Sequence, residues 1–281
     1  MANTVFFAWQ LDTPSEFNKK FIWEALQSAA LHMGTGSLPE MSPRPEKDTE
    51  GVPGTPNIVH TIFKRIAECS AFVADITFIA KSEAGKKTPN PNVLLELGYA
   101  VRSIGWDRTI LVLNDTYGAA SELPFDMLQH RWPIQYRVNE RTQVGEKKFN
   151  SLTEAFQTAL VDCSNFQLNR AVEMAQALDT ICLDIVAEHE FSTFVPMTLP
   201  PQTMGQALNS LVHDSAIRRL VDLGALQVVV QPEVSYGWTS DGRRMIEEIK
   251  RMHPGILAVL RDLKAKGPPN KAMQPTGKAG G

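Results

Sequence analysis

The chain has 281 residues, of which 43% are hydrophobic and 21% charged, and its formal net charge at pH 7 is −3. This length suits one large or two ordinary domains, and the small negative charge argues against general attraction to nucleic acid or anionic membranes. No apolar run reaches transmembrane length, and the apolar run at 5–9 lacks the basic region that precedes it in a signal peptide. Three widely spaced cysteines, Cys69, Cys163 and Cys182, predict free thiols in the cytoplasm, with no disulfide framework and no zinc site.

The first half of the chain alternates predicted strands with predicted helices. Strands are expected at 4–9, 38–42, 71–76, 109–114 and 131–136, and helices at 15–32, 56–68, from Pro91 to about Ile104, and at 147–162. The last strand contains a proline, which suits an edge position. Such alternation is typical of an α/β domain with a parallel sheet covered by helices on both faces.

The stretch 71–100 carries the strongest functional signal. It begins with a buried strand that has Asp75 near its end, crosses a polar loop and enters a helix. Asn90 can cap that helix, and Pro91 fits its first position. Glu96 falls on the border of the apolar stripe of the helix. Because ligands lie beyond the carboxyl ends of parallel strands, we expect Asp75, the loop and Glu96 to share one edge of the sheet.

The sequence of residues 90–100, Asn-Pro-Asn-Val-Leu-Leu-Glu-Leu-Gly-Tyr-Ala, resembles the motif of bacterial TIR-like domains. In many of these a helix Glu cleaves the N-glycosidic bond of NAD. The stretch also resembles the Glu-containing helix of nucleoside 2-deoxyribosyltransferases, which share the sheet topology and attack the same type of bond. The TIR-like resemblance is the closer one and spans residues 4–136. It implies a flavodoxin-like doubly wound parallel sheet, a catalytic carboxylate at Glu96, and NAD as a consumed substrate with no cofactor.

Further residues on the same edge are predicted to contact the substrate: Trp9, Gln10, Asp48, Asp75, Asn92 and Tyr99. Ordinary core packing explains Trp9 equally well. Turns favour Asp, Gly and Pro, and this preference explains Asp48 better than a contact with a ribose hydroxyl does. No histidine, cysteine and carboxylate cluster has metal spacing, and neither a redox dinucleotide fingerprint nor a Walker loop is present.

The second half of the chain has a different pattern. Helices are expected at 169–190 and 202–223, the latter with a break near His213, followed by strands at 226–230 and 234–238 and a helix at 243–252. Helices, a hairpin and a helix resemble a winged-helix module, which binds DNA or proteins. Because its basic residues are few, a sensing or protein-contact role is favoured. We therefore predict domains at 1–163 and 164–265 and a disordered tail at 266–281.

Three functions are compatible with these patterns. The first is a TIR-like NAD hydrolase, an N-glycosidase that assembles into a homo-oligomer when activated and, by resemblance, serves antiviral (anti-phage) defence in bacteria. The second is a transferase that moves deoxyribose between bases through a covalent intermediate on Glu96. The third is a non-catalytic nucleotide-binding module coupled to the second half of the chain.

Overall fold

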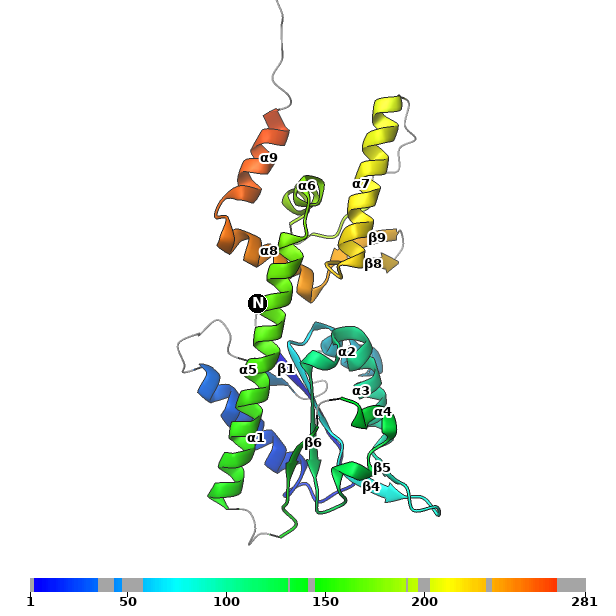
Figure 1. The fold of residues 1–281 in the computed structure, drawn as a ribbon, viewed down its shortest axis with the longest axis vertical. Coiled ribbons are helices and arrows are strands. Elements are labelled where there is room, and N and C mark those ends of the chain that lie inside the picture. The colour runs from blue at the N-terminus through cyan, green and yellow to red at the C-terminus, as the bar shows by residue number, and fades with distance from the viewer. Residues whose placement is uncertain are drawn as a thin grey trace, which may run out of the picture. The chain divides into compact units, whose positions relative to one another are not determined.

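The computed structural model describes residues 3–34, 43–46, 58–130, 132–140, 145–190, 192–196, 203–230 and 234–266. The chain divides into two compact units, Met1–Asn169 and Arg170–Gly281 (Figure 1). Each unit has its own hydrophobic core, so each is described by itself.

The first unit is built on a five-stranded parallel sheet. Its strands are β1 (Asn3–Ala8), β2 (Pro43–Glu46), β3 (Ala71–Asp75), β6 (Thr109–Asn114) and β7 (Ile134–Tyr136). They lie in the order β2-β1-β3-β6-β7. Counted along the chain, this order is 2-1-3-4-5, as in flavodoxin-like doubly wound sheets. The prediction of an α/β unit with a parallel sheet is therefore confirmed.

Helices cover both faces of this sheet (Figure 1). On one face lie α1 (Lys19–Gly34) and the first part of α5 (Glu146–Gln176), and on the other lie α2 (Ile58–Glu68) and α3 (Pro91–Ile104). Because neighbouring strand residues point to opposite faces, Phe7 joins the core under α1 and α5, whereas Phe6 joins the core under α2 and α3.

Three details of the first unit differ from the sequence prediction. The loop expected after β3 contains an antiparallel hairpin, β4 (Phe78–Lys81) and β5 (Lys87–Pro89). The first helix begins at Lys19, four residues later than predicted, because residues 15–18 form turns. The second strand lies at Pro43–Glu46, after the predicted range of 38–42, which falls outside the described residues. Short elements follow: η2 (Trp106–Arg108), η3 (Ala120–Glu122) and α4 (Phe125–Leu128).

The prediction of separate helices at 147–162 and 169–190 is wrong. Helix α5 is continuous from Glu146 to Gln176, because residues 163–169 contain neither Gly nor Pro. The break falls later, where Asp179 adopts an extended backbone and caps α6 (Thr180–Glu188). Its side chain accepts hydrogen bonds from the backbone N–H groups of Ile181 and Cys182. The domain boundary predicted after Cys163 therefore lies inside a helix.

The second unit packs helices around a hairpin. It contains α6, α7 (Met204–Asp222), the antiparallel strands β8 (Leu226–Val230) and β9 (Val234–Trp238), α8 (Ser240–Met252) and α9 (Ile256–Lys266). The predicted hairpin is confirmed, and α8 begins at Ser240, three residues before the predicted range, because Thr239 caps it. The break expected near His213 is absent, since α7 is continuous across it. Within the described residues, no helix is long and apolar enough to cross a membrane.

Candidate functional site

The strand order places the topological switch point of the sheet between β1 and β3. The chain leaves β1 for α1 on one face of the sheet and leaves β3 for α3 on the other face. In doubly wound sheets, ligands bind outside the carboxyl ends of the strands at the point where the connections diverge in this way. The loop after β1, the end of β3 and the start of α3 meet at this edge, and they hold most of the predicted site residues.

Gln10 and Asp75 are buried and contact each other at the switch point. The Gln10 amide nitrogen donates to a carboxylate oxygen of Asp75 at 3.4 Å and to the hydroxyl of Thr13 at 2.8 Å. Its amide oxygen accepts from the backbone N–H groups of Asp12 at 2.7 Å and Thr13 at 3.1 Å. An amide offers two donors and two acceptor positions, so all four are occupied within the protein. The Gln10 side chain therefore holds the β1 loop against the end of β3.

Asp75 is fully buried, and burial raises the pKa of its carboxyl from 3.8 to about 6. Hydrogen bonds from Thr77 and Gln10 oppose this shift, because they stabilise the charged form. One of them is the backbone N–H of Thr77, which donates to Asp75 at 3.1 Å. Since Asp75 has no exposed surface, a ligand at this edge does not contact it in this conformation.

The start of α3 is fixed to the β1 loop by one side chain. The side-chain oxygen Oδ1 of Asn90 caps the helix by accepting from the backbone N–H groups of Asn92 at 2.8 Å and Val93 at 3.3 Å. The Asn90 amide nitrogen donates to the carboxylate of Asp12 at 2.6 Å. Asn90 therefore joins the start of α3 to the loop after β1, as well as satisfying two N–H groups that the helix leaves open.

Glu96 is half-buried on α3, beside the stripe of buried residues that includes Val93 and Leu97. One turn further along, Tyr99 stacks on Phe63 of α2, with ring centroids 4.3 Å apart. Residues three apart share a helix face, so Glu96 lies on the flank of α3 that faces α2. Because α3 starts at the carboxyl edge of the sheet, Glu96 lies near that edge.

The other predicted contacts are dispersed. Trp9 packs on the opposite face of the sheet, with the core under α1 and α5, and the ammonium of Lys19 lies 2.9 Å from its ring centroid. One ring face of Tyr99 is covered by Phe63. Asn92 is exposed in the first turn of α3. Asp48 lies outside the described residues.

A network of buried polar side chains at this edge escaped the sequence analysis. The Thr77 hydroxyl accepts from the backbone N–H of Asn114 at 3.0 Å, and the Asn114 amide donates to Asn18 at 3.0 Å. The hydroxyl of Tyr136 donates to the side chain of Asn18 at 3.2 Å. The pKa of Tyr136 is raised, first by burial and second by the negative charge of Asp75. These polar residues follow or end apolar strands, and that position was the one feature of the sequence that could have identified them as site residues. Their contacts span 96 and 118 positions of sequence, so spacing could not pair them.

No family model matches this chain, and no curated protein matches it. Among the described residues, no group of three or more His, Cys, Asp or Glu side chains is arranged to hold a metal ion. The case for a function therefore rests on the switch point of the sheet and on the position of Glu96.

Proposed function

We propose that the first unit is a TIR-like NAD glycohydrolase that cleaves the bond between nicotinamide and ribose. The observation that carries this is the position of Glu96, half-buried on α3, the helix that follows β3 and its hairpin near the switch point between β1 and β3. The motif in residues 90–100 supports it by resemblance. On the same ground we propose an effector role in bacterial anti-phage defence.

The chemistry requires one well-placed carboxylate. Nicotinamide leaves as a neutral molecule, and the ribose develops the positive charge of an oxocarbenium-like transition state, as in glycoside hydrolysis. A carboxylate beside the ribose stabilises that charge or attacks the carbon that carries it. Glu96 is the side chain proposed for this role. Asp75, which is fully buried, holds the loop after β1 and the residues after β3 through its bonds to Gln10 and Thr77.

Glu96→Gln tests the proposal. Glutamine keeps the shape and helix propensity of glutamate but removes the charge, so we expect NAD cleavage to fall by a factor of about one hundred to one thousand. Because Glu96 is only half-buried, the free energy of unfolding should change by less than about 1 kcal/mol. Release of nicotinamide by the purified protein, followed by chromatography, measures the activity.

Glu83→Gln is the matched control, because Glu83 is exposed in the turn between β4 and β5 and should leave cleavage unchanged. Full activity of Glu96→Gln, with the fold intact, would exclude Glu96 as the catalytic residue.

A nucleotide-binding module without turnover is the second candidate. The observation that favours it is the complete occupation of the Gln10 amide by protein partners, which fixes the loop after β1 against the end of β3, as suits a rigid binding site. NAD that binds without nicotinamide release would select this function. A deoxyribosyltransferase would instead yield an exchanged nucleoside when it is supplied with a nucleoside and a free base.

The second unit is proposed to be a winged-helix-like module for protein contact and self-assembly. Its helix α7 exposes Met204, Leu208 and Leu211, at 78%, 55% and 63%, at helical spacing along one side. Residues 203–212 contain no charged side chain. A second copy of the chain is the partner that fits, because two identical stripes without charge meet without like-charge repulsion.

Substitution of Leu208 and Leu211 by serine tests this contact. The pair of changes removes exposed apolar area, so we expect weaker self-association and little effect on the free energy of unfolding. Light scattering of the purified protein over a range of concentrations measures the assembly. Val259→Ser, an equally exposed position on α9, serves as the control. If α7 instead contacts DNA, duplex binding that weakens steeply with salt will appear.

A further inference from the structure

Strand β8 has an open side in the second unit. It pairs on one side with β9, and the far side of β9 is taken by Phe194, which exchanges two backbone hydrogen bonds with Tyr236, at 3.0 Å and 2.8 Å. Among the described residues, no backbone group outside the hairpin bonds to β8. The outer side of β8 is therefore the place where a further strand can join this sheet.

The backbone groups of Val228 and Val230 point to this open side. Val228 lies opposite Tyr236, whose N–H and C=O groups both bond to Phe194 and so point away from β8. Opposite residues of an antiparallel pair alternate between hydrogen-bonded and non-bonded pairs. Val228, and Val230 two residues further on, therefore each direct an N–H and a C=O away from β9. Their side chains are 51% and 69% exposed, so this part of the edge reaches solvent.

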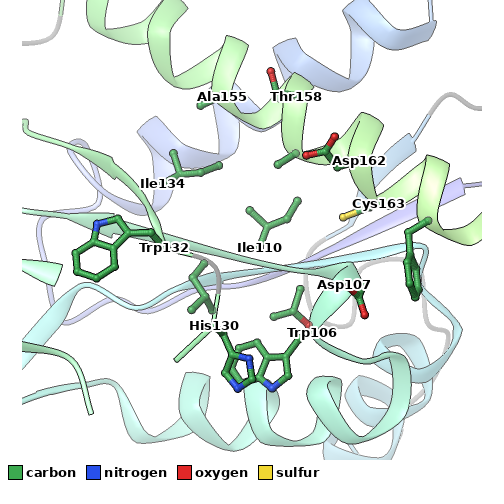
Figure 2. A pocket seen from close by; sticks show the side chains of 14 residues that line it. Trp106, Asp107, Ile110, His130, Trp132, Ile134, Ala155, Thr158, Asp162 and Cys163 are labelled. Atoms are coloured by element: carbon green, nitrogen blue, oxygen red, sulfur yellow. The ribbon is translucent and has the colours of Figure 1, made fainter. Parts of the chain in front are cut away.

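The edge strands of the first unit carry the features that usually prevent pairing between edges, which are short length, proline and charge. Strand β2 contains Pro43 and Pro45, and β7 has three residues and follows Pro133. Figure 2 shows Trp132 and Ile134 at the edge formed by β7, beside a hollow of about 650 Å³. In contrast, β8 contains neither proline nor a charged side chain.

We propose that β8 pairs with β8 of a second copy of the chain, in antiparallel orientation about a two-fold axis. The proposal rests on the assembly role proposed for the second unit, and it adds a contact separate from α7. With the two copies of Val229 opposite each other on the axis, Val228 of each copy lies opposite Val230 of the other. Each of these pairs then exchanges two hydrogen bonds through the outward N–H and C=O groups.

A second copy is the occupant that fits this edge. Residues 223–231 contain no charged side chain, so the two strands meet without like-charge repulsion. Val228, Val230 and Val234 lie on one face of the hairpin, and the two-fold axis brings this face of both copies together as one apolar strip. Because β8 and α7 are different surfaces that each pair with themselves, contacts through both extend the assembly beyond a dimer.

Sedimentation of the full-length protein carrying Leu208→Ser and Leu211→Ser tests the β8 contact in the absence of the contact proposed for α7. In that background we expect dimers that dissociate on dilution. Val228→Lys removes both cross-strand valine pairs of the dimer and places a charge on the edge, so the dissociation constant should rise by about tenfold. Val259→Lys is the matched control, because Val259 of α9 is equally exposed, at 52%, and should leave the dimer unchanged.

Amide hydrogen exchange locates the contact. The N–H groups of Val228 and Val230 should exchange more slowly in the dimer than in the diluted protein. The N–H of Val229 points towards β9 and should change little on dilution. Val228→Pro removes only an N–H that points outward, so it should abolish the dimer while the hairpin keeps its own bonds.

Three results would each overturn the proposal: a monomer at every concentration, an equal effect of Val259→Lys, or slow exchange of Val228 and Val230 that dilution does not change. The last result would mean that a segment of the same chain pairs with β8. Association that survives Leu208→Ser with Leu211→Ser and is lost with Val228→Lys would support the β8 contact and exclude the one on α7.

Discussion

Asp75 couples the stability of the first unit to pH. Its pKa is about 6 in the folded protein against an ordinary value of 3.8, so between these values the folded chain holds the proton more tightly than the unfolded chain. Protonation then favours folding, and this stabilisation is present below about pH 4 and lost as the pH rises through about 6. A pKa difference of about two units corresponds to about 3 kcal/mol.

Asp75→Asn should remove this dependence. As the pH rises from 4 to 6, we expect the free energy of unfolding of the unchanged protein to fall by up to about 3 kcal/mol, measured relative to Asp75→Asn at the same pH. Urea unfolding at several pH values measures both slopes. Asp126→Asn, which removes an exposed carboxylate of α4, should keep the slope of the unchanged protein. Parallel slopes for Asp75→Asn and the unchanged protein would mean that Asp75 does not titrate in this range.

At the scale of single residues, the sequence could locate Asp75 but could not supply its partners. The position of Asp75 at the end of an apolar strand follows from local pattern, and the structure places it at the end of β3. Its bond to Gln10 joins residues 65 positions apart, and only the pairing of β1 with β3 makes it short. The same limit applies to Trp9, whose side of the sheet depends on which helix covers which face.

Helix α3 was the most predictable element, because its start is encoded locally. Asn90 and Pro91 hold the positions expected of them, and the buried stripe follows helical spacing. The bond between Asn90 and Asp12 was not predictable, since it depends on the neighbouring strand. It makes the cap of α3 a tie between two loops of the candidate site.

Asn90→Ala should therefore destabilise the protein by about 1 to 2 kcal/mol, because the N–H groups of Asn92 and Val93 lose their acceptor. Asn90→Ser keeps a capping oxygen but loses the donor to Asp12, so it separates the two contributions. Thermal or urea unfolding measures both variants. If the bond to Asp12 contributes, Asn90→Ser will remain less stable than the unchanged protein. In a protein that already carries Asp12→Ala, Asn90→Ser should then have no further effect on stability.

Other elements show where local pattern fails. Strand β6 lies where the β-branched run predicts it. The hairpin of β4 and β5 was missed because its strands have four and three residues and are rich in lysine and exposed positions. The continuous α5 was missed because residues 163–168 were left between two predicted helices, although those residues have ordinary helix propensity.

One continuous helix, α5, contributes side chains to a core of each unit. Phe156 and Leu160 of α5 belong to the core of the first unit, and Met174 of the same helix belongs to the core of the second. The residues proposed for catalysis lie in the first unit, and the stripe proposed for assembly lies in the second. Independent cores predict that damage to one unit leaves the other folded.

Ile246→Ala tests this independence. Ile246 is fully buried in the second core, so its truncation leaves a cavity and should cost about 2 to 5 kcal/mol. Because that core shares no side chain with the sheet of the first unit, amide hydrogen exchange should accelerate in α8 and β9 and stay unchanged in β3 and β6. Ile22 is fully buried in α1, so Ile22→Ala should accelerate exchange in β3 and β6 and leave it unchanged in α8 and β9. Acceleration in both units by either change would mean that α5 couples them into one cooperative fold, and the proposed catalytic and assembly roles would then share a single stability.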